Sequence, residues 1–502
     1  MAVTTDQTVA LKYAQDFVDF VNESPTPYHA VDSVKKMLLN EGFEELIERN
    51  NWSKSHTIEK NGKYFVTRNG SSIIAFTVGG KYENGNGIAI VGAHTDSPCL
   101  RIKPILNRTS EGFITIGVEQ YGGLIAHTWF DRDLSIAGRV YVKDKDGQYV
   151  PKLLKIDKPL LRIPTLAIHL NREANTKFEF NKETKLVPIA GQITLDKNEQ
   201  EDSKRSGDSN CEKKHSCADD PNLQLTLEEF ESVQNVISRH NKSLIQLIAK
   251  ELEIEPQQIE DFELVLFDHQ KSIIGGLNDE FIFSARLDNL TSCFAATQGL
   301  IESIDQLPNE KGIQMISLFD HEEIGSRSLH GADSSFLPDI IQRVAKVDFE
   351  DTKSPRSIDL FHEIVSKSFL LSSDQAHGVH PNYAENYEAK NRPQVNLGPV
   401  IKINANQRYA TNSPGVVLIK KVADKARVPL QLFVVRNDSP CGSTIGPLLS
   451  SKLGLRTLDL GNPQLSMHSI RETGGTYDII RLMDLFKSFF ENYVDIDNKI
   501  LV

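Results

Sequence analysis

Five short segments of the sequence combine an apolar run with histidine or carboxylate side chains, the groups that bind catalytic metal ions. Such ligands, without thiolates, are typical of catalytic rather than structural zinc sites. In open α/β sheets, ligands bind outside the carboxyl ends of the strands, so we expect these side chains to meet at one sheet edge. The segments are IAIVGAHTD (His94, Asp96), FIFSARLDN (Asp288), MISLFDHEE (Glu322, Glu323), LLSSDQAHGVH (Asp374, His377, His380) and PQLSMHSIRE (His468).

Each segment taken alone also has a plainer interpretation. A single histidine at a strand end is more often a hydrogen-bonded surface residue. Asp288 could cap the helix predicted after it, and Glu322 with Glu323 could open a helix whose positive end favours acids. The conjunction of all five segments, rather than any one of them, favours a metal site.

The adjacent residues Glu322 and Glu323 suggest two different roles, one as a metal ligand and one as a base. Two metal ions about 3.5–4 Å apart need a shared carboxylate and about three protein ligands each, with one position left open. A carboxylate that binds no metal must still accept the proton of the attacking water and pass it to the leaving amine. One glutamate as ligand and the other as base would make their adjacency tolerable.

Composition limits the class of protein. The chain has 502 residues and a formal net charge of −12, which favours two domains and argues against nucleic-acid or anionic-membrane partners. No apolar run approaches the 18 or so residues of a membrane span, and the N-terminus does not resemble a secretory signal. Five cysteines suit a reducing compartment, and the spacing of CEKKHSC (residues 211–217) matches no common zinc module.

The order of predicted elements indicates an α/β fold built from the two ends of the chain. Strands alternate with helices after about residue 266, whereas residues 98–265 are mostly strand-like. We therefore predict a helix-flanked mixed β-sheet domain over 1–97 and 266–502, with a β-rich domain inserted at 98–265. Residues 196–222 are dense in charge and predict a mobile loop. Thr226 and Glu229 predict a capping box that opens a helix carrying Ile237, Leu244 and Ile248.

The segments GAHTDSP, RLDN, DHEEIGS, SSDQAHGVHPNY and MHSIRE resemble, in this order, the metal-site motifs of the aspartyl aminopeptidases, a family of dizinc metallopeptidases. The resemblance runs from SPTPYHAV to the last predicted helix, with 196–222 as the main unmatched stretch. It implies two Zn²⁺ per subunit; the sequence leaves open whether Co²⁺ or Mn²⁺ takes their place. The implied ligands are Asp288 as the bridge, His94 and Asp374 for one ion, and Glu323 and His468 for the other.

The same resemblance implies roles beyond the metal ligands. Glu322 would be the general base that activates a water between the metals, and Asp96 would orient the imidazole of His94. Lys402 would pair with the side-chain carboxylate of an N-terminal Asp or Glu, although a solvated strand lysine is the plainer alternative. His377 would contact the substrate or its oxyanion, with His380 nearby.

His169, in RIPTLAIHLNR, would reach from the inserted domain into a neighbouring subunit's active site and help hold the scissile carbonyl. That role implies a homo-oligomer in which the inserted domain mediates dimerisation. The resemblance implies a tetrahedral dodecamer whose enclosed chamber admits peptides only.

The resulting hypothesis is a zinc-dependent aminopeptidase acting on peptides with an N-terminal Asp or Glu, cytoplasmic, with delivery to a vacuole or lysosome left open. One alternative keeps the dizinc site but changes the substrate, as in an aminopeptidase of neutral residues, a deacylase or a carboxypeptidase. Another is a non-catalytic assembly or cargo protein on the same fold. Lys402 distinguishes the acidic-residue aminopeptidase from the enzymes with another substrate. Glu322 distinguishes an enzyme from a non-catalytic protein.

Overall fold

The structure, a computed structural model, describes residues 6–52, 58–105, 108–195, 234–347, 349 and 359–501. Its contacts divide the chain into two compact units. Unit 1 comprises Met1–Pro98 and Lys271–Val502, and unit 2 comprises Cys99–Gln270. The predicted loop 196–222, the predicted cap at Thr226 and the segment CEKKHSC lie outside the described residues.

Unit 1 is built on a mixed sheet, nine-stranded within the described residues, with the order β1-β2-β3-β15-β4-β16-β20-β18-β19. The predicted α/β class is thereby confirmed. The strands at its centre are buried on both faces, which is why they appear in the sequence as continuous apolar runs. The strands are β1 (Glu44–Glu45), β2 (Lys63–Arg68), β3 (Ser72–Val78), β4 (Ile88–His94), β15 (Ile313–Phe319), β16 (Phe369–Ser373), β18 (Val400–Ile403), β19 (Gln431–Val434) and β20 (Arg456–Gly461).

Four central strands of this sheet point the same way. β4 pairs in parallel with both β15 and β16, and β16 pairs in parallel with β20. Their carboxyl ends therefore share one edge, where ligands bind in sheets of this kind. Although β3 and β4 follow each other in the chain, they are not neighbours, because β15 pairs with both and lies between them.

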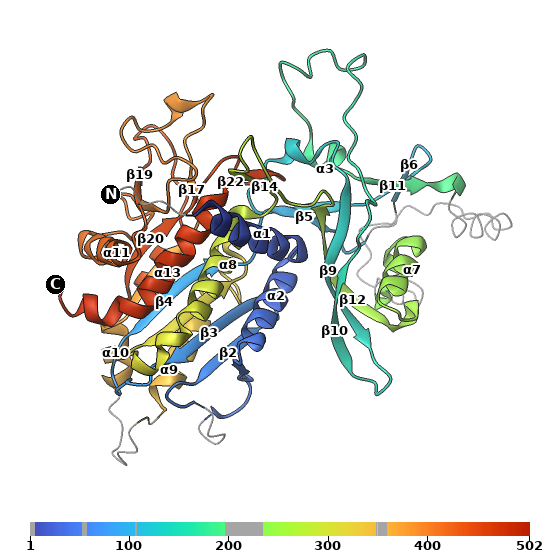
Figure 1. The fold of residues 1–502 in the computed structure, drawn as a ribbon. Helices are drawn as coiled ribbons and strands as arrows, with labels where there is room; N and C mark the ends of the chain where they lie inside the picture. The colour runs from blue at the N-terminus through green and yellow to red at the C-terminus, as the bar shows by residue number, and fades with distance from the viewer. Residues whose placement is uncertain are drawn as a thin grey trace, which may run out of the picture. The chain divides into compact units, whose positions relative to one another are not determined.

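Helices cover both faces of the sheet, and each face has its own hydrophobic core. Within β4, Ala89 and Val91 belong to one core and Ile88 and Ile90 to the other, as expected from the alternation of side chains along a strand. Figure 1 shows α1, α2, α8 and α13 side by side across one face. The first core includes α1 (Gln7–Glu23), α2 (Pro27–Asn40), α8 (Leu287–Glu302), α11 (Ser413–Ala426) and α13 (Thr476–Asp497), and the second α9 (Phe336–Ala345), α10 (Asp359–Ser366) and α12 (Ile445–Leu453).

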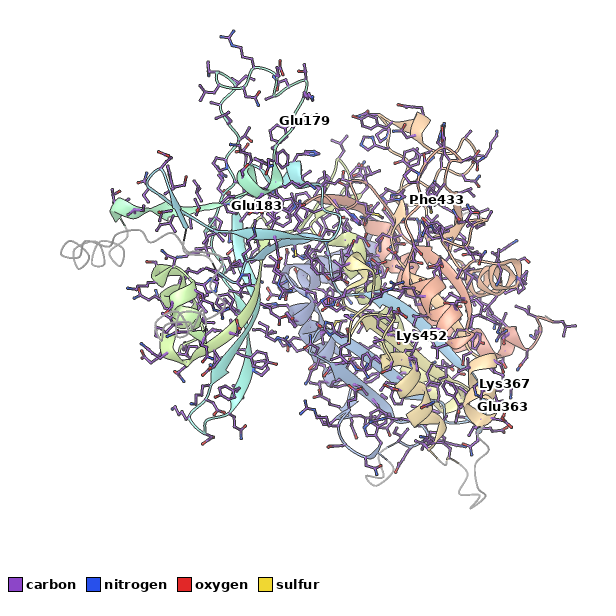
Figure 2. All side chains as sticks on the ribbon, turned by 180° about the vertical axis from the view of Figure 1, so that it is seen from behind. Glu179, Glu183, Glu363, Lys367, Phe433 and Lys452 are labelled. Atoms are coloured by element: carbon purple, nitrogen blue, oxygen red, sulfur yellow. The ribbon has the colours of Figure 1, made fainter. Side chains whose placement is uncertain are left out.

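Two small sheets complete unit 1 and carry further site residues. One has the order β13-β14-β22, and the other pairs β17 with β21. Figure 2 labels Glu363 and Lys367 at one end of unit 1, where they form an ion pair of 2.6 Å, and Phe433 of β19 towards the other end. The strands are β13 (Ile273–Gly275), β14 (Phe281–Ser284), β17 (Ala376–His377), β21 (Pro463–Gln464) and β22 (Glu472–Gly475).

Unit 2 is rich in strands. A five-stranded sheet has the order β10-β9-β12-β5-β8, and a three-stranded sheet the order β11-β7-β6. Phe267 and Asp268 still pair with β9, so this unit extends past residue 265, where the sequence suggested its end. Its elements include β5 (Cys99–Ile102), β6 (Arg108–Ser110), β7 (Phe113–Thr115), β8 (Val118–Tyr121), β9 (Leu134–Lys143), β10 (Tyr149–Lys155), α3 (Lys182–Lys185), β11 (Ile189–Gln192), α6 (Val236–Arg239), α7 (Lys242–Glu251) and β12 (Ile259–Asp268).

Two sequence expectations about local elements need correction. The helix expected to run through Ile248 is broken at His240 and Asn241 into α6 and α7, because the Asn241 side chain accepts the N–H groups of Ser243 and Leu244 and so caps a new helix. The strand expected to end at Asp288 ends at Ser284, and Asp288 lies in the first turn of α8. No helix of the described ranges has the length and apolarity needed to cross a membrane.

Candidate metal centre

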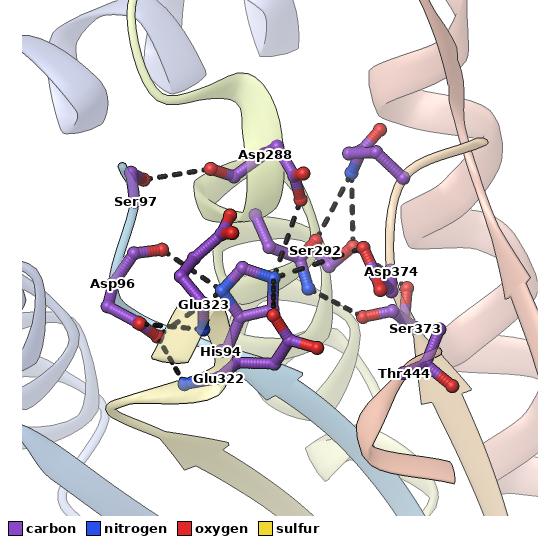
Figure 3. Close-up of polar contacts among 12 residues, drawn as sticks. His94, Asp96, Ser97, Asp288, Ser292, Glu322, Glu323, Ser373, Asp374 and Thr444 are labelled. Carbon is purple, nitrogen blue, oxygen red and sulfur yellow. Dashed lines mark hydrogen bonds and ion pairs between the residues drawn. The ribbon is translucent and has the colours of Figure 1, made fainter. Parts of the chain in front are cut away.

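The parallel strands of unit 1 bring most of the predicted site residues to one edge of the sheet. His94 ends β4, Asp374 follows β16, and Glu322 and Glu323 begin a short 3₁₀ turn just after β15. Asp288 comes from the start of α8 and His468 from the loop between β21 and β22. Figure 3 shows His94, Asp288, Glu322, Glu323 and Asp374 converging from these separate elements.

Asp288 lies at the middle of this group and directs one carboxylate oxygen to each of two histidines. Its Oδ1 is 3.4 Å from Nε2 of His94, and its Oδ2 is 3.6 Å from Nε2 of His468. The residue is only 3% exposed. A carboxylate with one oxygen facing each of two imidazoles has the arrangement that a bridging ligand requires.

The other carboxylates group around the same two imidazoles. Glu323 Oε1 is 3.3 Å from Nε2 of His468. Asp374 Oδ1 and Glu322 Oε2 each lie 3.9 Å from Nε2 of His94. The five proposed ligands thus form two sets that share Asp288, while Glu322 stands beside the His94 set.

The donor set fits divalent cations. Oδ1 of Asp288 and Oε1 of Glu323 are buried and have no hydrogen-bond partner among the described residues. Burying such oxygens unsatisfied is costly unless a cation is held between them. One oxygen of Asp288 and one of Glu323 also lie with a nitrogen of His94 inside a single group of donor atoms, all within 4.8 Å of one another.

The electrostatics of the site show how strongly it attracts positive charge. Burial alone would lower the pKa of His94, but the carboxylates of Asp288, Asp374 and Asp96 outweigh it and raise that pKa well above its usual value. For His468 burial likewise opposes protonation, yet Asp288 and Glu323 raise its pKa to about 11. These carboxylates stabilise a positive charge at the imidazoles. A bound metal ion would supply such a charge at the same place.

The acids themselves divide into two kinds. Burial would raise the pKa of Asp288, but His468 and His94 hold it well below its usual range. Burial raises the pKa of Glu323 to about 7 and also raises that of Glu322 well above its usual value, with Asp374 and Glu323 adding to the effect on Glu322. Asp288 is therefore the firmly ionised member of the cluster, whereas Glu322 and Glu323 both hold a proton more readily than an ordinary glutamate.

Asp96 does more in the structure than the sequence suggested. Its backbone oxygen lies 3.0 Å from Nδ1 of His94, and its Oδ1 lies 3.4 Å from the same nitrogen. In addition, Oδ1 accepts the N–H of Glu322 and Oδ2 that of Glu323, each at 3.1 Å. One buried carboxylate thus orients both the histidine and the pair of glutamates.

Glu472 is a site residue that the sequence reasoning missed. It is 3% exposed, and its two oxygens accept the backbone N–H of His468 at 2.9 Å and that of Asp288 at 3.2 Å. Burial and the nearby Asp288 raise the pKa of Glu472 to about 8. The signal was present in the sequence, since Glu472 is the last residue of PQLSMHSIRE, but its contacts are to backbone groups that no residue pattern reveals.

Lys402 lies at the side of the centre, next to Asp374. The residue is 3% exposed, and its Nζ donates a hydrogen bond to the backbone oxygen of Gln375 at 3.1 Å. The same Nζ lies 3.6 Å from Oδ2 of Asp374 and 5.0 Å from the ring centroid of Tyr409. Tyr409 lines a pocket of about 320 Å³ together with His377, His380 and Phe433.

His169 is the predicted residue that the structure does not bring into this group. It is an exposed residue of unit 2, whereas all the residues above belong to unit 1. Its contribution to a neighbouring subunit stays a prediction.

Within the pocket lined by Tyr409, Nδ1 of His380 accepts the N–H of Asn382 at 3.2 Å.

Known proteins share this fold and sequence over nearly their whole length. One relative, Aspartyl aminopeptidase 4 of Saccharomyces cerevisiae, is 55% identical over 503 residues, which cover 99% of this chain and 98% of the relative. A cryo-EM structure of the Ape4 and Nbr1 complex matches with a TM-score of 0.87 at 46% identity, covering 100% of this chain and 90% of that chain. The mApe1 dodecamer of S. cerevisiae matches with a TM-score of 0.79 at 29% identity, covering 97% of this chain and 98% of that chain.

A family model adds the chemistry to this likeness. The model described as aminopeptidase I zinc metalloprotease (M18) matches residues 20–490, a range that includes every residue of the Asp288-centred group. The donor set on the sheet edge, buried and rich in carboxylate and imidazole, is one that zinc prefers. Fold, sequence and ligand chemistry agree, and the chain belongs to the M18 family of zinc metalloproteases.

Proposed function

We propose that this protein is a zinc-dependent aminopeptidase that removes aspartate or glutamate from the N-terminus of peptides. The observation that carries the choice of substrate is Lys402, a cation that is 3% exposed beside the metal centre. A buried ammonium whose neighbour Tyr409 lines a pocket of about 320 Å³ is suited to pair with a carboxylate side chain. The name of the S. cerevisiae relative supports the same substrate class.

The proposed ligands of two zinc ions are those brought together around Asp288. Asp288 would bridge the ions, His94 and Asp374 would complete one site, and Glu323 and His468 the other. Zinc bound there supplies a Lewis acid for the scissile carbonyl and lowers the pKa of water towards neutrality. Co²⁺ and Mn²⁺ accept the same donor types and are proposed substitutes.

Glu322 is the proposed general base. Its carboxylate lies beside the His94 set, and its raised pKa suits a group that takes up a proton and then releases it. Glu322 accepts a proton from the attacking water and transfers it to the departing amine, so the carboxylate is regenerated in each cycle. Asp96 holds the backbone of Glu322 and Glu323 so that the base and the ligand keep distinct positions.

The pocket residues orient the substrate. Lys402 holds the acidic side chain of the N-terminal residue, and His377 contacts the substrate or its oxyanion from the pocket wall. His169 is proposed to act in the active site of a neighbouring subunit, where it helps hold the scissile carbonyl. This role makes assembly a condition for activity, and the dodecamer formed by mApe1 supports a tetrahedral dodecamer here, with unit 2 as the dimerisation unit. We further propose a cytoplasmic protein, with delivery to a vacuole or lysosome as the open alternative.

A panel of peptides tests the proposal directly. Peptides that begin with Asp, Glu, Ala or Leu and are otherwise identical are incubated with the assembled protein before chelation, after chelation and after return of zinc. We expect cleavage of the Asp and Glu peptides only, lost with chelator and restored by zinc.

Two other results have separate meanings. Zinc-dependent cleavage of the Ala or Leu peptides would keep the metal centre but overturn the role of Lys402. Absence of cleavage by assembled, zinc-loaded protein would overturn the enzymatic proposal and favour an assembly or cargo protein.

A further inference from the structure

A second cluster of metal-binding side chains lies on the segment that follows β15. It consists of Asp320, His321 and His330, whose ligand atoms all lie within 4.8 Å of one another. Oδ2 of Asp320 is 3.7 Å from Nε2 of His321 and 3.6 Å from Nε2 of His330. The side chain of Asp320 is 4% exposed and those of His321 and His330 are 22% and 13% exposed, so the cluster is enclosed but reachable by a small ion.

The spacing of this cluster matches that of the Asp288-centred group in the same structure. There, carboxylate oxygens lie 3.3–3.9 Å from imidazole Nε2 atoms. Tetrahedral zinc with ligand bonds of about 2.0–2.2 Å keeps its ligand atoms roughly 3.3–3.5 Å apart. Both clusters are therefore close to the separation that one cation imposes on its ligands.

The cluster has its own supports, distinct from those of the Asp288-centred group. The hydroxyl of Ser72 accepts the N–H of Asp320 at 2.9 Å and donates to the backbone oxygen of His330 at 2.7 Å, so it fixes the two residues relative to each other. Nδ1 of His321 lies 2.9 Å from Oγ of Ser328, a contact that leaves Nε2 facing Asp320. Ligating histidines are commonly held in this way through the other ring nitrogen.

Within the carboxylate the two oxygens have different tasks. Oδ1 of Asp320 accepts the N–H of His321 at 2.8 Å, which orients the group, while Oδ2 faces the two imidazoles. The imidazole rings of His321 and His330 have centroids only 4.4 Å apart. Two imidazoles and one carboxylate form a set that binds zinc, cobalt or manganese rather than calcium or magnesium.

We propose that Asp320, His321 and His330 bind a further divalent cation of the zinc class, separate from the ions held around Asp288. Such an ion would link residues 320 and 330 and so brace the segment that carries Glu322 and Glu323. The count of bound ions does not depend on the proposed substrate or on catalysis; only the check of folding at the end rests on the proposed function.

Zinc binding by the assembled protein tests this proposal. Protein stripped with chelator is brought to equilibrium with a series of free Zn²⁺ concentrations, and bound zinc per subunit is measured by elemental analysis. We expect His330→Gln and Asp320→Asn each to bind one equivalent fewer than wild type at saturation. His362→Gln, which changes an exposed histidine of α10, should bind as much as wild type.

Cobalt gives a second readout that is independent of counting. Co²⁺ ligated by imidazole absorbs visible light, so the last equivalent added to wild type should produce absorption that is absent in His330→Gln. Equal saturation of wild type and His330→Gln, with equal cobalt spectra, would overturn the proposal. Loss of the extra equivalent on changing Cys211 and Cys217 to serine, but not on changing His330, would overturn it too and assign the ion to CEKKHSC.

Cleavage measured with a restricted amount of zinc shows whether the His330→Gln variant is folded. With zinc added only to the level that restores full cleavage in wild type, His330→Gln should cleave a Glu-initiated peptide within about twofold of wild type. A loss of the extra equivalent together with retained cleavage supports the new site. Loss of both in His330→Gln and Asp320→Asn alike would show that the cluster is structural and would contradict a separate ion.

Discussion

The ammonium of Lys402 lies 3.6 Å from Oδ2 of Asp374. The lysine proposed to bind the substrate and a proposed zinc ligand therefore form one buried ion pair. Asp374 directs its other oxygen to His94. A carboxylate that arrives with the substrate therefore meets a lysine already partly neutralised by the metal centre. Any substitution of Lys402 must be tested for its effect on metal as well as on substrate.

Lys402→Met should remove the preference for acidic substrates. A hydrogen bond between charged groups contributes about 1.5–3 kcal/mol, which corresponds to a loss of roughly 10–150-fold in kcat/KM. We expect that loss for Glu- and Asp-initiated peptides, with little change for Ala-initiated ones, in protein whose zinc content equals that of wild type. Lys420→Met, at an exposed position of α11, is the matched control. An equal loss on all peptides would contradict a role in specificity.

Glu322→Gln should abolish proton transfer while keeping the shape of the side chain. Loss of a general base typically lowers kcat by about 10²–10⁴-fold. Because Glu323, rather than Glu322, approaches His468, zinc content should stay at the wild-type level. The measurement is kcat on a Glu-initiated peptide with metal analysis of the same sample. A variant that holds zinc and cleaves as fast as wild type would exclude Glu322 as the base.

Glu472→Gln should weaken metal binding without removing a ligand. The amide keeps one acceptor oxygen, so one of the N–H groups of Asp288 and His468 loses its partner and the two ligands are held less firmly. Loss of such outer contacts typically lowers metal affinity about 10–100-fold. Competition with a chelator measures this, and excess zinc should restore cleavage. Glu251→Gln, at an exposed position, should match wild type, and so would Glu472→Gln if its contacts were unimportant.

Acid should weaken unit 2 through His240. Burial and the nearby Arg239 lower the pKa of His240 to about 4, and its Nδ1 has no hydrogen-bond partner among the described residues. Between the unfolded value of 6.5 and about 4, the unfolded chain binds a proton that the folded unit does not. The stabilising contribution is therefore complete above pH 6.5 and falls as the pH drops, by up to about 1.4 kcal/mol per pH unit.

Urea unfolding measures this contribution in unit 2 alone. Trp129 is the tryptophan of unit 2 and Trp52 that of unit 1, so Trp129 fluorescence in a Trp52→Phe background reports unit 2. We expect His240→Gln to flatten the dependence of unfolding free energy on pH between 6.5 and 4.5. His127→Gln, at an exposed histidine, should leave the slope unchanged. Identical slopes in all three proteins would assign the acid sensitivity to other groups.

The strands and most of the Asp288-centred group could be predicted because the information is local. A strand buried on both faces appears as an apolar run; β4 ends at His94, β16 ends just before Asp374, and β15 ends three residues before Glu322. The helix break at Asn241 also has a local cause, but it competes with an apolar pattern that continues on either side of it. At this position the cap formed by Asn241 begins a new helix, although the periodic apolar pattern continues.

Features formed by distant segments could not be predicted in this way. The place of β15 between β3 and β4 depends on pairing between strands that are far apart in the sequence. The hold of Glu472 on Asp288 acts through a backbone N–H, which every residue except proline offers. The approach of His330 to Asp320 depends on how the chain turns between them, and neither residue stands in a spacing that suggests a ligand.

The sheet order has a consequence for how the protein is made. β4 pairs with β15 and β16, and β16 pairs with β20, so the strands that carry the metal ligands are translated far apart. His468 and Glu472 are translated after every other member of the Asp288-centred group, so a nascent chain has an incomplete set of zinc donors until then. Unit 2 is one continuous stretch, from Cys99 to Gln270, and can complete its hydrogen bonding while unit 1 still awaits its central strands. The proposed set of zinc ligands is therefore complete only once His468 has been added to the chain, and a protein truncated before β21 would lack one of these ligands.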